Sequence, residues 1–201
     1  MKQIPFTSIV IAFFCAACSS PPKTEVTVID YRNTEGAYVL VYSGDEDFRI
    51  QLEDRLVSDL ALRELKGFPS HPDIPDVQDS SRDEVLNFAR AKKAMFVLVV
   101  EEVAVGQAGV VDEQAQITQA HPTLRDFYQQ SLPKDYEYAE DDQVFVEVSA
   151  FLIQENTAKL VWSGTTWSLQ ADGEGDRIAD LSTTITDAIR QAQRKRRLGL
   201  D

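Results

Sequence analysis

Two cysteines carry the most distinctive chemistry in this chain of 201 residues, and both lie near its start, at Cys15 and Cys18. An apolar or small run of 14 residues, Ile4–Ala17, precedes Cys18, and Lys2 is the only charge before it. A run of this length fits the core of a signal peptide and is too short to span a bilayer as a stable helix. The sequence therefore predicts that residues 1–17 are a cleaved signal.

The four residues from Cys15 to Cys18 resemble the Leu-Ala/Ser-Gly/Ala-Cys pattern of bacterial lipoprotein signals, with cysteine in place of the usual leucine. The resemblance implies a diacylglycerol on the Cys18 sulfur and a fatty acid such as palmitate on its new amino group. Two or more acyl chains on one protein give a stable membrane anchor. Residues 18–24 would then be the acylated cysteine and its tether. Ser19, and not an aspartate, follows Cys18. The resemblance to lipoproteins of Gram-negative bacteria then implies sorting to the outer membrane, with the domain facing the periplasm. An ordinary cleaved signal with an unmodified Cys18 is the alternative.

The remaining sequence offers little for catalysis. Cleavage and acylation would leave no free thiol, no disulfide and no cysteine-based metal site in the mature domain. His71 and His121 are far apart and lack the spacing of metal ligands. His71 with Asp73 and Asp76 is a possible cation site, and solvated turn residues are the alternative. No nucleophile-elbow, Walker or dinucleotide-binding pattern occurs. We therefore expect no enzyme activity, no cofactor and no metal.

The net charge of the chain and its charged runs indicate which kinds of partner it can bind. With Lys+Arg 20 and Asp+Glu 33, the formal net charge is −13, which argues against nucleic acid as the main partner. The acidic run at residues 135–142 lacks the ligand spacing and central glycine of a calcium loop, so a solvated face is the simpler interpretation. Near the carboxyl end, Arg194, Arg196 and Arg197 either complement the negative end of a helix or form a docking surface for an acidic partner or lipid headgroups.

Aromatic residues are the other binding candidates. Phe127, Tyr128, Tyr136, Tyr138 and Trp167 could form an exposed patch, since aromatic side chains anchor protein interfaces. Packing in the core or within loops is the alternative. The two-residue period of a strand places Trp167 and Trp162 on opposite faces, and Trp162 is expected in the core.

Hydrophobic periodicity gives the elements that must position these residues. Apolar or alternating runs predict strands at residues 25–31, 36–43, 95–100, 144–153 and 159–169. Spacings of three and four predict helices that end near residue 65, span 81–93, and span 176–196. Ser43 and Ser81, each three residues before a glutamate, would begin the first two with capping boxes. Residues 105–142 are the least regular stretch, and such long insertions are usually functional or mobile.

This order of elements predicts a single α/β (α+β) domain over residues 25–198, with a mixed sheet of four or five strands and helices packed mainly on one face. The segments EVLNFARAKKAMFVLVV and VFVEVSAFLIQENTAKLVWSGTTW, between the first and last helices, resemble a loose group of envelope lipoproteins. That group includes penicillin-binding-protein activator lipoproteins, the curli secretion channel subunit and the amino-terminal domain of TolB.

The resemblance implies a non-catalytic lipoprotein that binds or regulates another envelope protein, with residues 105–142 and the exposed edges as its binding surface. A subunit of an oligomeric assembly or secretion channel is the first alternative, so the oligomeric state stays open. A metal-binding or hydrolytic periplasmic protein is the second.

Overall fold

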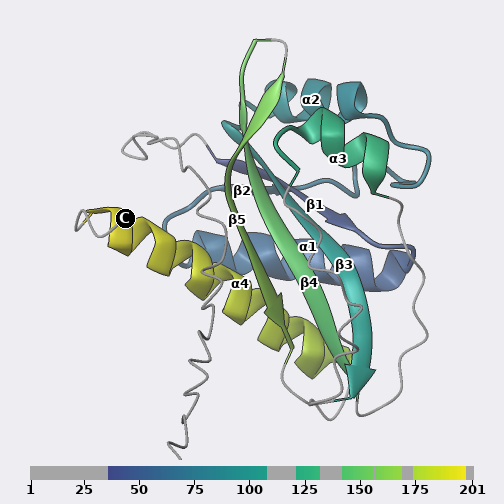
Figure 1. The fold of residues 1–201 in the computed structure, drawn as a ribbon, viewed down its shortest axis with the longest axis vertical. Helices are drawn as coiled ribbons and strands as arrows, with labels where there is room; N and C mark the ends of the chain where they lie inside the picture. The colour runs from purple at the N-terminus through teal and green to yellow at the C-terminus, as the bar shows by residue number, and fades with distance from the viewer. Residues whose placement is uncertain (1–35, 108–120, 132–141, 156, 169–173, 198–201) are drawn as a thin grey trace, which may run out of the picture.

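A mixed sheet lies at the centre of the domain, and its described strands follow the order β2-β1-β3-β4-β5 (Figure 1). The structure is a computed structural model that describes residues 36–107, 121–131, 142–155, 157–168 and 174–197. The strands are β1 Ala37–Tyr42, β2 Gly67–Pro69, β3 Phe96–Gln107, β4 Asp142–Ile153 and β5 Ala158–Trp167. β1 pairs in parallel with β2 and β3, whereas β4 pairs antiparallel with β3 and β5. The predicted mixed sheet is therefore confirmed, while the strand predicted at residues 25–31 lies outside the described residues.

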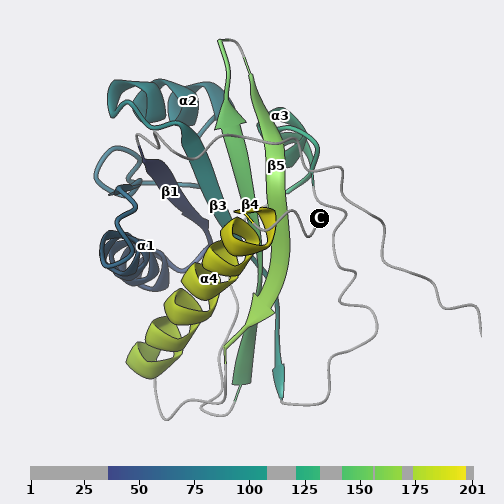
Figure 2. The same cartoon turned by 90° about the vertical axis from the view of Figure 1, so that its left-hand side faces the viewer.

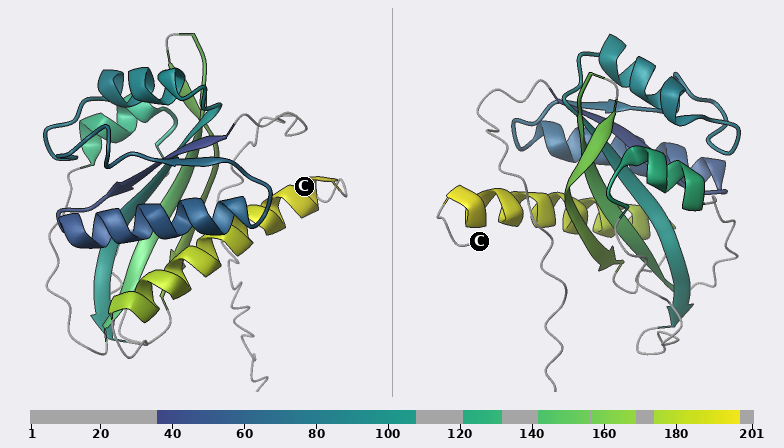
Figure 3. Two further views of the ribbon diagram at one scale, coloured as in Figure 1. Left: turned by 180° about the vertical axis from the view of Figure 1, so that it is seen from behind. Right: turned by 45° about the horizontal axis from the view of Figure 1, so that its top comes forward.

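Helices cover both faces of this sheet. They are α1 Glu46–Ala61, α2 Arg82–Ala91, α3 Leu124–Gln130 and α4 Glu174–Arg197. The two longest, α1 and α4, lie side by side on one face (Figure 2). α2 and α3 pack against the other core cluster, and in the left view of Figure 3 α2 runs along the top with α3 behind it. Helices mainly on one face were expected, and the second layer is a feature that the sequence analysis did not include. No helix in the described part of the chain is both long and apolar enough to cross a bilayer.

The second layer follows from the composition of β1 and β3, which are apolar on both sides. Toward α1 and α4 point Val39, Val41, Leu98 and Val100. Toward α2 and α3 point Tyr38, Leu40, Val97 and Val99. A strand that is apolar on both faces must be covered on both, as in the sheets of α/β proteins.

The hairpin of β4 and β5 and the long last helix were both predicted and are confirmed. Alternate residues of β4 pack with the apolar face of α4, namely Val144, Val146 and Val148 with Ile178, Leu181 and Ile185. The irregular stretch at 105–142 is partly regular, since β3 continues to Gln107 and α3 lies within it.

The starts of α1 and α2 differ in how well their sequence signals predicted them. The capping box of α2 is confirmed, because Ser81 accepts a hydrogen bond from the backbone of Glu84 and the Glu84 side chain accepts one from the Ser81 backbone. In α1, by contrast, Asp45 is the cap and its Oδ1 accepts from the Phe48 nitrogen at 3.0 Å. Ser43 instead accepts from the Asp45 nitrogen at 3.0 Å. The predicted cap at Ser43 is therefore wrong by two positions, because a carboxylate nearer to the first turn outcompetes it.

The short strand β2 was not predicted. Glycine and proline so close together predict only the end of the preceding helix. That helix, α1, ends at Ala61, earlier than the predicted end near residue 65, and Gly67–Pro69 form the strand. A proline is tolerated here because β2 is an edge strand. Gly67 allows close packing on α1, since a Cβ at this position would lie 3.1 Å from Cγ2 of Val57.

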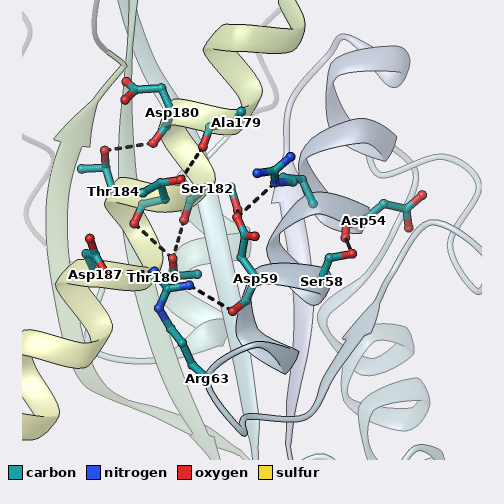
Figure 4. Close-up of polar contacts among 12 residues, drawn as sticks. Asp54, Ser58, Asp59, Arg63, Ala179, Asp180, Ser182, Thr184, Thr186 and Asp187 are labelled. Carbon is teal, nitrogen blue, oxygen red and sulfur yellow. Dashed lines mark hydrogen bonds and ion pairs between the residues drawn. The ribbon is translucent and has the colours of Figure 1, made fainter.

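A polar contact joins α1 to α4 (Figure 4). Asp59 accepts a hydrogen bond from the Ser182 hydroxyl at 2.7 Å and lies 3.1 Å from Nε of Arg55. Nearby, Arg63 Nη2 lies 2.9 Å from Asp187 Oδ1. Because Asp59 and Ser182 are both buried, their hydrogen bond favours one alignment of the two helices, which together support the sheet from one side.

Candidate functional site

The described part of the predicted binding segment is centred on α3. Thr123 caps this helix, since its Oγ1 accepts from the Asp126 nitrogen at 3.2 Å and donates to Asp126 Oδ2 at 2.6 Å. Leu124 and Phe127 are fully buried in the core between α3 and the sheet. The segment is therefore not simply a loop, because its helix is a packed part of the domain.

Aromatic rings hold α3 against β1. The ring of Phe127 meets Tyr42 edge-on at 4.9 Å between centroids, Tyr128 at 5.4 Å and His121 at 5.6 Å. Tyr128 is partly buried, and its hydroxyl shares a hydrogen bond of 3.2 Å with Ser80 Oγ. Phe127 is thus not available as an exposed binding residue, and the alternative of core packing holds for it.

A histidine and a serine meet where the chain enters and leaves α3. His121 Nε2 lies 3.2 Å from Ser131 Oγ, and the hydroxyl of Tyr42 donates to the Ser131 carbonyl at 3.4 Å. Burial lowers the pKa of His121, which Asp126 opposes. A serine beside a histidine is also the nucleophile–base arrangement of many hydrolases. Here, however, His121 is 4% and Ser131 6% exposed, and the pair ties together the two ends of one short helix.

Two carboxyl groups that the sequence analysis missed lie beside this cluster. Glu101 of β3 and Glu147 of β4 are register partners, both nearly buried. Burial, and then the charge of Glu101, raise the pKa of Tyr42 to about 12. The signal was present in the alternation, because Glu147 falls between Val146 and Val148 on the face opposite those valines. A glutamate at such a position normally indicates a face that contacts solvent, so the alternation alone does not predict that Glu147 is buried.

Trp167 is the most exposed of the predicted aromatic candidates that the structure describes. It is 50% exposed at the end of β5, and its ring lies 6.2 Å from that of Phe145. Trp162 is partly buried on the opposite side, against the cluster formed with α1 and α4. The predicted division of the two tryptophans between the faces is therefore confirmed.

The other predicted binding residues cannot be placed with them. Tyr136 and Tyr138 lie outside the described residues, as does most of the acidic run 135–142. Arg194, Arg196 and Arg197 belong to the last turns of α4, and their side chains are also outside the description.

The second histidine and its acidic neighbours are separately engaged. His71 Nε2 pairs with Asp54 at 2.9 Å, Asp73 pairs with Lys92 at 3.2 Å, and Asp76 accepts from the Gln78 nitrogen at 2.8 Å. Within the described residues no three acidic, histidine or cysteine side chains come together as metal ligands. The alternative of a cation site at these residues therefore gains no support from the geometry.

A buried carboxylate on α1, Glu53, holds the start of the loop that contains His71, Asp73 and Asp76. Glu53 Oε1 accepts from the Val41 nitrogen at 3.0 Å and from Ser70 Oγ at 2.7 Å. Its Oε2 accepts from the backbone nitrogens of Ser70 and His71, both at 2.7 Å. Burial raises the pKa of Glu53, while these hydrogen bonds and the charge of Arg49 act to lower it. The carboxylate occupies the place where β2 leaves β1, so its role is to complete the edge of the sheet.

Comparison with known proteins gives a loose structural similarity. No family model and no curated protein matches the chain. Similar solved structures include the PelC dodecamer from Paraburkholderia phytofirmans, at 16% identity and a TM-score of 0.39, over 81% of this chain and 92% of that one. A variant of PelC in another crystal form has a TM-score of 0.40 over 78% of this chain and 86% of that one, also at 16% identity. The lipoprotein GNA1162 from Neisseria meningitidis has a TM-score of 0.36 at 13% identity, over 79% of this chain and 96% of that one.

Proposed function

We propose that the protein is a bacterial outer-membrane lipoprotein, acylated at Cys18, whose periplasmic domain is not an enzyme and binds another component of the cell envelope. One observation carries the proposal: the apolar run Ile4–Ala17 ends in two alanines directly before Cys18. Hydrophobic burial of two or three acyl chains, at about 0.8 kcal/mol for each methylene, is enough for a lasting anchor.

The chemistry of the described domain supports a binding role. The His121–Ser131 pair is buried and closes the ends of α3. Glu53 accepts hydrogen bonds from three residues of the surrounding backbone and loop. In each case the polar side chain that could act in catalysis is engaged in holding the fold.

The binding surface that we propose combines the exposed side of α3 with Trp167. The buried face of α3 fixes its position, so its outward residues Arg125 and Gln129 form a rigid surface. Tyr128 lies at the margin of this surface. A subunit of an oligomeric envelope assembly remains the alternative, and there the same surface would contact a second copy of the chain.

Replacement of Cys18 tests the anchor. Cys18→Ser should abolish labelling by radioactive palmitate and move the protein from the membrane to the soluble periplasmic fraction. Cys15→Ser is the matched control and should remain acylated and membrane-bound, since cleavage removes this residue. Ser19→Asp should stay acylated but shift to the inner membrane in a Gram-negative host. A Cys18→Ser protein that still fractionates with membranes would contradict the proposal.

Photo-crosslinking in the native envelope tests the binding surface. A crosslinking residue at Arg125 or Trp167 should give a discrete adduct that mass spectrometry can identify, whereas one at Asp47 on α1 should give none. An adduct with a second copy of the chain, together with a multimer by light scattering, would favour the assembly subunit.

A further inference from the structure

Among the described residues, nothing pairs with the outer edge of β5 along much of its length. At its start, the Leu160 nitrogen donates to the Pro122 carbonyl at 3.0 Å, and Lys159 bridges to Thr123. Beyond Leu160, no described residue pairs with this edge, because β5 is the last strand in the sheet order. An open edge presents a row of unpaired backbone donors and acceptors to which another strand can bind.

The register identifies which backbone groups face outward. The Ser168 nitrogen donates to the Val144 carbonyl at 2.9 Å, and hydrogen-bonded and non-bonded pairs alternate along an antiparallel ladder. Gly164 and Thr166 therefore bond to β4, and the N–H groups of Ser163, Thr165 and Trp167 point away from it. Natural edges are usually protected by a charge or a proline, and residues 163–167 contain neither.

We propose that residues 25–31 of the same chain bind this edge as a sixth strand, antiparallel to β5. This segment, EVTVIDY, is rich in β-branched residues and alternates as a strand does. It comes shortly before Ala37, the first residue of β1. The segment is therefore joined to the sheet by only a short link, from Tyr31 to Ala37.

The topology sets the direction of the added strand. Ala37 pairs with Phe96, Phe96 with Leu152, and Leu152 with Lys159, so β1 and β5 begin at the same end of the sheet. The added strand would lie one position beyond β5, so four strand spacings separate it from β1, about 19 Å. The link from Tyr31 to Ala37 can reach about 20 Å when extended. A segment that ends just beyond the contact of Pro122 and Thr123 with the start of β5 must begin beside the end of β5, and it therefore runs antiparallel.

This pairing would also orient the domain on the membrane, a consequence that rests on the proposed acylation of Cys18. Glu25 would lie near Trp167, and the tether from Cys18 to Glu25 spans at most about 24 Å. The lipid anchor would then lie at the Trp167 end of β5. α2 lies toward the other end of the strands (Figure 1), and would face away from the membrane.

Disulfide trapping in the full-length protein tests the pairing. Thr165→Cys is combined in turn with Val26→Cys, Thr27→Cys, Val28→Cys and Ile29→Cys, and crosslinking within one chain is read by protease digestion without reductant. We expect one position to dominate. Moving the partner cysteine from Thr165 to Ser163 should shift that maximum toward the carboxyl end of the segment, as only an antiparallel pair requires. Ala61→Cys, exposed at the end of α1 near the opposite edge, is the matched control.

Amide hydrogen exchange gives a second readout that needs no cysteine. The outward N–H groups of Ser163, Thr165 and Trp167 should be protected, and Val28→Pro should raise their exchange at least tenfold. The Gly164 and Thr166 amides, which bond to β4, should keep their protection and serve as internal controls.

Three results would overturn the pairing: no crosslink above the Ala61→Cys control, crosslinks only between chains, or outward amides that exchange freely in the intact protein. Mass analysis of the amino-terminal peptide in the same samples reports acylation independently. Loss of the pairing and loss of the anchor are therefore distinguishable.

Discussion

Glu53 is fully buried, and its carboxylate accepts four hydrogen bonds, three from backbone N–H groups and one from a serine hydroxyl. A carboxylate offers two oxygens that only accept, so it satisfies the backbone N–H groups of Val41, Ser70 and His71 at one point. Those groups would otherwise be unpaired, because β2 ends at Pro69 while β1 continues to Tyr42. One side chain from a helix thus replaces the missing part of a strand.

Glu53→Gln is expected to lower the free energy of unfolding by about 2–4 kcal/mol, because the amide NH₂ would face backbone donors and leave them unsatisfied. Urea denaturation at neutral pH measures the change. Glu46→Gln, at an exposed position in the first turn of α1, is the control and should shift stability by less than about 0.5 kcal/mol. Equal free energies of unfolding for the wild type and Glu53→Gln would contradict this prediction, because the four hydrogen bonds would then make no net contribution to stability.

At the scale of elements, local signals predicted the structure wherever the chain itself supplies the partner. The Ser81 capping box, the hairpin of β4 and β5, and the long apolar face of α4 all depend on residues close in sequence. Local signals did not predict the elements whose formation depends on contacts with residues far away in the sequence. β2 forms because it can pair with β1, and α3 is held in place where Phe127 packs on Tyr42.

The α2 cap gives a prediction of its own. Ser81→Ala should cost about 1 kcal/mol, since the Ser81 hydroxyl accepts from the backbone of the first turn of α2. Ser58→Ala is the matched control, because Ser58 lies exposed in the interior of α1 with its hydroxyl bonded to the Asp54 carbonyl. There alanine is the better helix former, so stability should stay level or rise by a few tenths of a kcal/mol. Chemical denaturation of both variants makes the comparison, and similar losses at the two sites would contradict it.

For the whole molecule, the sequence predicted the mixed sheet and the order of its main elements, but only part of the candidate site. Periodicity shows that a residue such as Phe127 or Trp167 is aromatic and on a given face, but not whether another layer covers it. Phe127 is covered by the sheet beneath α3, whereas Trp167 lies at the end of an edge strand and stays exposed. The second helical layer decides this difference, and it is set by contacts between elements far apart in the chain.

The open edge of β5 leads to a prediction about the state of the whole molecule. If residues 25–31 cover this edge, the mature chain should be unable to use it for self-association. Removal of residues 19–31 would expose the outward N–H groups of Ser163, Thr165 and Trp167, and strands without edge protection tend to pair with other copies. The shortened chain should therefore show a mass that rises with concentration in sedimentation or light-scattering measurements. Thr165→Lys in the shortened chain should restore the monomer, because a charge on an edge strand disfavours pairing, and the same substitution in the intact chain should leave its mass unchanged. A shortened chain that remains monomeric throughout would mean that the edge does not attract strands, and both the pairing and the orientation inferred from it would fail.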